Sequence, residues 1–291
     1  AGVDNALGEK CRQTAITGSP VLTIGIVKCT HTDNDNRRDK LIISRVSGVD
    51  GSALCVQIAN PFLSEIFHNF SRIIKEQKNL PTSVDSRSSK IVWWEKRLQL
   101  DASLRKILSQ LDIDVLGAWR VLLLGDLVLQ QQQQLRDLYD ELMSRLRILA
   151  SKLDLQLVAS ASQLLRLLIH GLDCMTDDEF RLALSSLLLN PCEHKSAPVC
   201  LVLSSDKQSV LQKISTCEHV ADMVTFARKY LAELKRTTSL TNAGCFLQRS
   251  AVIVSLDDVT RHFTWESLDS LNNQRIYRTP SVAIAQSIAD F

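Results

Sequence analysis

The stretch 251–280 constrains the fold of this chain more than any other segment. It opens with Ala-Val-Ile-Val-Ser-Leu, a short run rich in β-branched residues that predicts a buried strand. The pair Asp257–Asp258 follows, and acidic residues at that place favour a turn. An aromatic segment around Trp265 comes next, and Thr279–Pro280 ends the stretch. We therefore expect the stretch to contribute a strand to an α/β fold.

Residues 20–60 predict further strands. Three short apolar runs occur there, divided by clusters of Asp, Asn and Gly, and this pattern is typical of strands joined by hairpin-like turns. Pro61 follows the third run. Apolar residues then recur at helical spacing over about 62–78, and a Ser-rich linker covers 79–90.

Most of the chain after residue 90 predicts helices packed by leucine. The first of them has one apolar face that includes Trp94, Leu98 and Leu111, with charged residues opposite. A capping box of Thr176 and Glu179 predicts the start of a later helix, because each side chain can bond the backbone N–H of the other residue. The expected helices cover 62–78, 91–112, 130–149, 153–169, 177–189 and 206–235.

Two apolar runs within this region are ambiguous. Residues 118–124 follow Gly117, and their β-compatible side chains favour a strand over a helix. Residues 198–204 fit either a strand or an early helical turn.

Composition excludes several classes of protein. Hydrophobic residues make up 45%, charged residues 23% and the net charge is +2, so nothing calls for nucleic acid or an anionic membrane as a partner. None of the eight cysteines forms a CxxC pair, so we expect reduced thiols and a cytoplasmic or nuclear location. No signal peptide is visible, and no apolar run approaches the roughly 18 residues of a membrane span.

Two groups of residues carry a family resemblance. One is the Trp-Glu-Ser-Leu segment that begins at Trp265 and Glu266, followed by Arg-Thr-Pro-Ser. The other group consists of Trp93, Trp94, Arg97, Leu98, Leu100, Asp101, Leu116, Gly117, Trp119, Leu122, Leu123 and Leu124. Together they resemble separases, the cysteine endopeptidases of the caspase-like clan that cut cohesin at anaphase. We interpret these tryptophans as core residues where a helix meets a sheet, not as ligand-binding residues.

The resemblance implies an α/β fold with a defined order of parts. A caspase-like pseudo-protease sheet would carry a large all-helical insertion, followed by the first strand of a second caspase-like domain. The expected boundaries are a loose lead-in over 1–19, a pseudo-protease-like region over 20–125, a helical insertion over 126–245 and the beginning of the protease domain over 246–291.

A protease of this clan needs a Cys–His dyad, in which the thiolate attacks the scissile carbonyl and the imidazole transfers protons. In separases both residues follow the Trp-Glu segment, in His-Gly and Gly-Cys-Ser-like motifs, and neither motif occurs after Trp265. His170, Gly171 and Cys174 lie close in sequence, but the His-Gly pair fits a helix end with glycine at C′. We therefore expect no catalytic residue in this chain.

Metal and cofactor sites are also not expected. The triplets Cys192-Glu193-His194 and Cys217-Glu218-His219 place Cys and His on different sides of a helix, and their spacing differs from that of structural zinc sites. The chain has no Gly-rich phosphate-binding loop.

Asp257 and Asp258 are the candidate substrate-binding residues. Loops at the carboxyl ends of strands face ligands in α/β folds, and an acidic pair there could receive the arginine that separases require before the cut bond. A simple turn-forming role is the alternative. Glu233-Leu-Lys-Arg236 matches the Glu-x-x-Arg pattern that separases cut, at a predicted helix-to-linker junction, although such a match also arises by chance.

The resemblance implies that the chain is a non-catalytic part of a separase, inactive by itself, whose complete enzyme cleaves the cohesin kleisin to release sister chromatids. Expected partners are a securin-like inhibitor, a helical regulatory region or subunit, and the kleisin substrate, in the cytoplasm and nucleus. The alternative is a helical scaffold that binds a regulatory protein and serves no enzyme.

Overall fold

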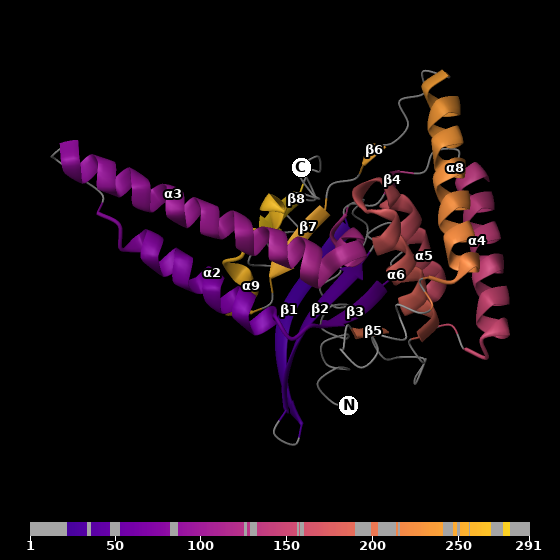
Figure 1. Ribbon diagram of the computed structural model, residues 1–291, viewed down its shortest axis with the longest axis horizontal. Helices are drawn as coiled ribbons and strands as arrows, with labels where there is room; N and C mark the ends of the chain where they lie inside the picture. Colours follow the sequence, from indigo (N-terminus) through magenta and orange to yellow (C-terminus); the bar gives the residue numbers. More distant parts are fainter. Residues whose placement is uncertain are drawn as a thin grey trace.

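A computed structural model of the chain shows a central sheet, with two long helices projecting to one side and a helical block on the other (Figure 1). The residues that the structure describes are 22–33, 36–46, 53–81, 87–124, 127–128, 133–155, 157, 160–189, 199–202, 214, 216–240, 247–248, 251–255, 257–268 and 276–279.

The central sheet has six strands and is mixed. Its spatial order is β5 (Val199–Val202), β3 (Ala53–Ala59), β2 (Asn36–Val46), β1 (Leu22–Asp33), β7 (Ala251–Ser255) and β8 (Ile276–Thr279). Strand β2 is antiparallel to β1 and β3, while the pairs β3–β5, β1–β7 and β7–β8 are parallel. The strands predicted within 20–60 and at 251 are confirmed, and the ambiguous run near 200 is a strand.

The stretch 251–280 lies in the same sheet as the N-terminal strands. Parallel pairing joins Leu22 to Ala251 and Ile26 to Ser255. The resemblance implies that this stretch begins a second caspase-like domain, whereas among the residues described its strand extends the sheet that the N-terminal strands form. Three successive residues of β7, Val252 to Val254, are all buried, which is typical of an interior parallel strand. Strand β7 pairs with the edge of the long strand β1. The sequence of β7 alone does not reveal with which strand it pairs.

Helices α2 (Leu63–Lys78) and α3 (Arg87–Ser109) pack against each other and project from the sheet (Figure 1). The side chain of Asn60 accepts a 2.8 Å hydrogen bond from the backbone N–H of Phe62 and so supports the start of α2. Helix α2 buries one face, made of Leu63, Ile66, Phe67, Phe70 and Ile73. The first predicted helix is thus confirmed, and α3 begins within the predicted linker.

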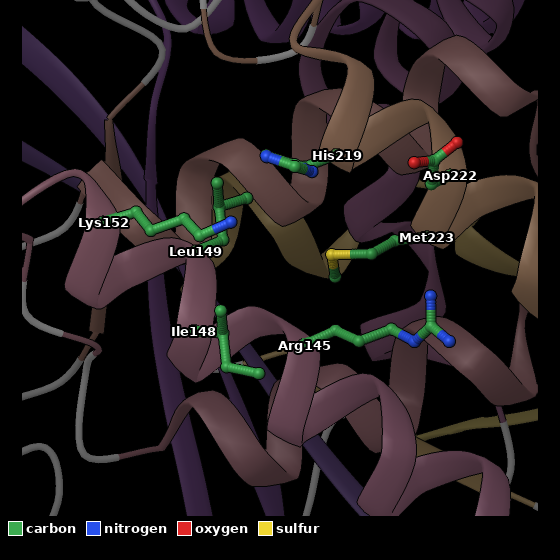
Figure 2. A pocket seen from close by; sticks show the side chains of 7 residues that line it. All are labelled: Arg145, Ile148, Leu149, Lys152, His219, Asp222 and Met223. Atoms are coloured by element: carbon green, nitrogen blue, oxygen red, sulfur yellow. The ribbon is translucent and has the colours of Figure 1, made fainter.

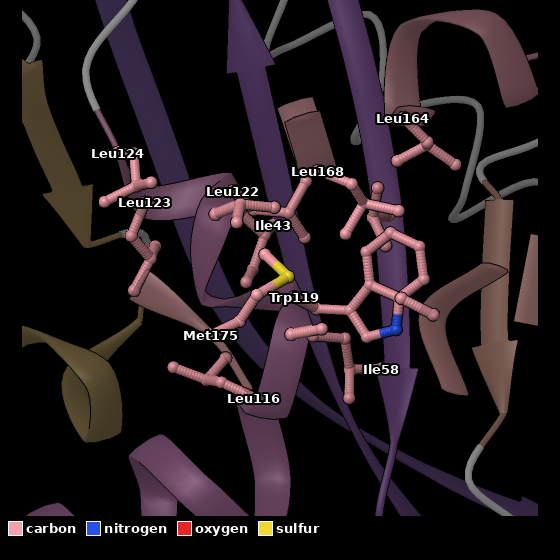
Figure 3. Packing of buried hydrophobic residues seen from close by; sticks show 14 of the residues in the cluster. Ile43, Ile58, Leu116, Trp119, Leu122, Leu123, Leu124, Leu164, Leu168 and Met175 are labelled. Atoms are coloured by element: carbon pink, nitrogen blue, oxygen red, sulfur yellow. The ribbon is translucent and has the colours of Figure 1, made fainter. Parts of the chain in front are cut away.

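The apolar segment after α3 is helical, and the strand predicted at 118–124 is wrong. Helix α3 runs into η1, a π-helix over Gln110–Leu116, and then into η2, a 3-10 helix over Gly117–Leu123. Gly117 has φ +49° and ψ −133°, a conformation that favours glycine, at the junction of the two. Segment η2 is buried on every side, between the sheet and the helical block (Figure 3). An apolar run of that kind has no periodicity to distinguish strand from helix.

The helical block contains α4 (Gln133–Lys152), α5 (Ala161–His170), η3 (Leu172–Cys174), α6 (Asp177–Leu189) and α8 (Glu218–Leu240). The predicted leucine face of α4 is confirmed, because Leu138, Leu142 and Leu146 are fully buried. A two-stranded antiparallel sheet of β4 (Leu127–Val128) and β6 (Leu247–Gln248) joins the two ends of the block.

Two predicted helices have different bounds. The segment expected to be helical from residue 153 first forms a turn at Leu153–Asp154, where Asp154 has φ 54°, and α5 begins only at Ala161. The single helix expected over 206–235 is also wrong, because Thr216 and Cys217 form a turn before α8 begins. Apolar spacing continues through both turns, so the periodicity alone does not reveal them.

The capping box of α6 is confirmed. The backbone N–H of Glu179 donates to the Thr176 hydroxyl at 3.2 Å, and the backbone N–H of Thr176 donates to the Glu179 carboxylate at 2.8 Å. Gly171 follows α5, as predicted, but its φ is −95°. A left-handed conformation at the helix end is therefore not the reason for a glycine at this position. A Cβ at this position would lie 2.2 Å from Val121 Cγ1, and close packing of α5 on η2 is therefore what requires glycine.

Among the helices described, none combines the length and the apolar character needed to cross a membrane.

Candidate functional site at the carboxyl ends of the parallel strands

Trp265 fixes the position of the segment that follows β7. It lies in η4 (Trp265–Ser267) and is completely buried. Its ring centroid is 4.8 Å from that of Phe263 and 6.4 Å from that of Phe67 on α2. The indole N–H donates a 3.1 Å hydrogen bond to the carbonyl of Thr260. Trp265 is therefore a core residue, as predicted, and it attaches the segment to α2.

Asp257 lies just beyond the carboxyl end of β7 and joins three elements. One carboxylate oxygen accepts a 2.8 Å hydrogen bond from the backbone N–H of Lys28 on β1 and a 2.7 Å bond from the Thr260 hydroxyl. The other oxygen accepts a 2.8 Å bond from the backbone N–H of Thr260, in the short helix α9 (Asp258–Arg261). Asp257 thus forms the turn that the sequence predicts and also connects β1, β7 and α9.

A buried ion pair lies at the same edge of the sheet. The Lys28 ammonium is 3.2 Å from the Asp39 carboxylate, and these side chains are 11% and 5% exposed. Ser64 at the start of α2 accepts a 3.2 Å hydrogen bond from the Lys28 ammonium and donates one to Asp39. Since each charge has a partner, the cluster avoids the cost of an isolated buried ion. It connects the β1–β2 hairpin to α2.

The proposed substrate role of Asp257 and Asp258 stays a prediction. Three internal donors already occupy most of the acceptor capacity of the Asp257 carboxylate, which is about four lone-pair sites. Asp258 is the first residue of α9, and the description does not extend to its side chain. The same holds for the side chain of Glu266, which follows Trp265 in η4.

The signature tryptophans fall into two groups. Trp119 and Trp265 are 3% and 0% exposed, so the core prediction is confirmed for both. Trp94 is 60% exposed, and the core prediction is wrong for this residue. Trp93 is half-buried, donates a 3.1 Å hydrogen bond to the carbonyl of Pro81 and lies edge-to-face against Trp94, with ring centroids 4.8 Å apart.

Sequence reasoning missed a buried arginine that connects η2 to α6. Arg120 is 8% exposed, and its Nε donates a 2.6 Å hydrogen bond to the carbonyl of Gly117. Its guanidinium pairs with Glu179 and lies 3.9 Å from Asp112. The sequence does contain a signal for this site, because Arg120 lies within an otherwise apolar run. A charged side chain buried in such a run needs a partner of opposite charge or a hydrogen-bond acceptor.

Two further arginines bind backbone carbonyls nearby. Arg45 on β2 is 5% exposed and donates to the carbonyls of Leu122 and Leu124, at 2.9 and 2.5 Å. Arg228 on α8 donates to the carbonyl of Met175 at 2.5 Å and to Asp177 at 2.7 Å. These bonds satisfy groups at ends of short helical segments, where carbonyls lack partners within the helix.

The candidate Cys–His pair lies between two helices of the helical block. His170 ends α5 and Cys174 ends η3, and the backbone N–H of Cys174 donates to the Gly171 carbonyl at 2.9 Å. They therefore come from one turn between helices, not from two strands. No group of three metal-binding side chains occurs in the part of the chain that the structure describes. The triplet at Cys192 lies outside the described residues.

The Glu-x-x-Arg match lies inside a helix. Helix α8 continues to Leu240, beyond Arg236, so the predicted helix-to-linker junction is wrong in position. Glu233 accepts two hydrogen bonds from the Arg236 guanidinium, at 2.6 and 3.1 Å. These bonds and the adjacent positive charge hold the pKa of Glu233 below its ordinary value.

A small pocket lies between α4 and α8, with a volume of about 110 Å³ (Figure 2). Its lining residues are Arg145, Ile148, Leu149, Lys152, His219, Asp222 and Met223. Arg145 is held by Glu141 at 2.6 Å and lies 4.5 Å from the centre of the Phe226 ring. The pocket is shallow and mixed in charge, and it lies on the helical block rather than at the edge of the sheet.

Comparison with known proteins gives the family. A family model described as the separin protease domain matches residues 39–290. The crystal structure of the Saccharomyces cerevisiae separase–securin complex is similar in fold, with a TM-score of 0.50 and 14% sequence identity. The similarity covers 100% of this chain and 19% of that chain, so this protein spans about a fifth of the length of the solved separase chain. No curated protein sequence matches. Because the family model covers most of the sequence, the chain belongs to the separin protease-domain family of separases.

Proposed function

We propose that this chain is a non-catalytic part of a separase, a cysteine protease that cleaves the cohesin kleisin and so releases sister chromatids. The observation that carries the proposal is the match of residues 39–290 to the separin protease domain. In the complete enzyme, the sheet and the helical block would form a platform beside the catalytic unit. The cytoplasm and nucleus are the proposed locations.

The sequence after Trp265 supports a non-catalytic role. That segment contains neither histidine nor cysteine, so it cannot supply a thiolate and an imidazole in the order that the family resemblance implies. Two residues of this region connect parts of the fold. Trp265 binds the Thr260 carbonyl, and Asp257 binds the backbone of Lys28.

A securin-like inhibitor is the proposed partner. The solved separase with a similar fold was crystallised as a complex with securin, which supports the proposal. A helical regulatory region or subunit and the kleisin substrate are further proposed partners. In the complete enzyme, Asp257 and Asp258 are proposed to help receive the substrate arginine, and unchanged turnover of an Arg-containing substrate in Asp257→Asn and Asp258→Asn enzymes would refute that role.

Titration calorimetry of the full chain with a securin-like polypeptide tests the proposed partnership. The control is a polypeptide with the same composition in scrambled order. Binding to the first polypeptide and not to the second is the expected result. Equal heats for both polypeptides, or no heat with either, would refute it.

A further inference from the structure

Helix α3 has two apolar faces, and one of them has no partner among the described residues. The first face includes Leu100 and Ile107, which are 7% and 5% exposed and face the core. The second includes Ile91, Trp94 and Leu98, which are 54%, 60% and 65% exposed. Large apolar side chains that gather on one exposed face mark an interaction site more often than scattered ones do.

The exposed residues follow the spacing of a helix–helix interface. Ile91, Trp94 and Leu98 are separated by three and four residues, so they lie within about 60° of one another around the helix, on the side opposite Leu100. Exposed Ala102 and Arg105 continue the same line. We call these five residues the α3 stripe. Its length is about 21 Å, at 1.5 Å per residue, which matches four turns of a partner helix.

Trp94 is held in place before any partner binds. Its ring lies edge-to-face on Trp93, with an interplanar angle of 86°, and Trp93 is attached to the Pro81 carbonyl by its indole N–H. An aromatic residue fixed in this way loses little conformational freedom on binding. Tryptophans of this type contribute most of the binding energy at many interfaces.

Charges beside the stripe select the partner. Lys90 and Lys106 are exposed beside the stripe and Arg105 is exposed within it, against one exposed carboxylate, Glu95. Arg97 and Asp101, on the same part of the helix, form an ion pair with 3.8 Å between Nε and Oδ1, so together they add no net charge. A second copy of α3 would bring like charges together, whereas a helix with acidic flanks would be attracted.

We propose that the α3 stripe binds an amphipathic helix of another polypeptide, with apolar residues at heptad a and d positions and acidic residues beside them. Helix α3 projects from the sheet and packs beside α2 (Figure 1). The inference does not depend on the proposed protease role, because it rests on the exposed side chains of α3.

Two synthetic helical peptides test the proposal, each of two heptads with leucine at a and d. One has glutamate at e and g, and the other has lysine there. Binding to the full chain is measured by fluorescence anisotropy of a labelled peptide. We expect the acidic peptide to bind and the basic peptide to bind at least about tenfold more weakly.

The variants form a matched pair. Leu98→Glu places a charge within the stripe, and Val92→Glu places the same charge at a 63% exposed position of the same helix, outside the stripe. We expect Leu98→Glu to weaken binding by about tenfold or more and Val92→Glu by less than about twofold. Leu98→Gln serves the same purpose if Leu98→Glu fails to fold.

Four results would overturn the proposal. They are the absence of binding, equal binding of both peptides, equal effects of the two variants, and occupation of the stripe by something else. The last would appear as a dimer in sedimentation, or as binding to phosphatidylserine vesicles, that Leu98→Glu abolishes and Val92→Glu preserves.

Discussion

The carboxylate of Asp257 accepts a 2.8 Å hydrogen bond from the backbone N–H of Lys28, which lies 229 residues earlier in the chain. This bond attaches the turn after β7 to the middle of β1. It explains in structural terms why an acidic residue follows the last predicted strand. Any further role of Asp257 in a complete enzyme must be compatible with this bond.

Replacement of Asp257 by alanine should lower the free energy of unfolding by about 1–3 kcal/mol, because two backbone N–H groups and the Thr260 hydroxyl lose their acceptor. Urea denaturation followed by circular dichroism measures the change. The exposed Asp140 provides the control, and Asp140→Ala should change stability by less than about 0.5 kcal/mol. Equal effects of the two changes would show that the Asp257 bonds contribute nothing.

Arg120→Met should lower the free energy of unfolding by about 3–5 kcal/mol, because it leaves the buried carboxylate of Asp112 and the Glu179 carboxylate without their cation. Arg147→Met, at an exposed position of α4, should have little effect. Denaturant titration of both variants gives the comparison. A loss below about 1 kcal/mol for Arg120→Met would contradict the buried ion network.

The two glycines near η2 should respond differently to alanine. Gly171→Ala places a Cβ 2.2 Å from Val121 Cγ1, so we expect a loss of about 1–3 kcal/mol in the free energy of unfolding. Removal of the obstructing methyl in Gly171→Ala with Val121→Ala should cost less than the sum of the single changes. Additive costs would contradict the packing explanation.

Gly117→Ala should also destabilise the chain, for a different reason. Its φ of +49° disfavours any residue with a Cβ, while no atom lies within 4 Å of the added carbon. Val121→Ala should therefore give no rescue of Gly117→Ala, and thermal unfolding of the double variant measures this. Rescue would show that crowding, not backbone conformation, is the cause.

The ion pair near the end of α8 predicts a pH dependence. Hydrogen bonds from Arg236 lower the pKa of Glu233, so the pair stabilises the helix above the ordinary glutamate pKa, and this support is lost as pH falls through the lowered value. NMR titration of the Glu233 carboxyl should give a pKa below the ordinary value. Arg236→Gln should restore the ordinary value, whereas an unchanged pKa in that variant would contradict the assignment.

Local sequence patterns predicted the elements whose residues have a clear period or end in a distinctive cap. The leucine face of α4, the Thr176–Glu179 capping box and the strand at 251 belong to this class. Patterns failed where burial is complete, as around Trp119, because an apolar segment buried on all sides has no period. They also failed for Trp94, since an aromatic residue that packs in a core and one that is exposed on a helix look the same in sequence.

The pairing of β7 with β1 could not be predicted from local sequence, because the choice of edge depends on contacts between distant segments. The same applies to the candidate site. The position of the aspartate pair directly after a strand identifies it in the sequence. The cluster of Lys28, Asp39 and Ser64 cannot be identified in that way, because the fold brings these residues together from three different elements.

We propose that this chain is a separase region without its own catalytic dyad. The most direct measurement is hydrolysis of a fluorogenic peptide that contains Glu-x-x-Arg by the purified chain, before and after alkylation of its cysteines. We expect no turnover above buffer in either sample. Turnover that disappears on alkylation would show a working cysteine nucleophile within the chain and would contradict the proposed absence of a catalytic dyad.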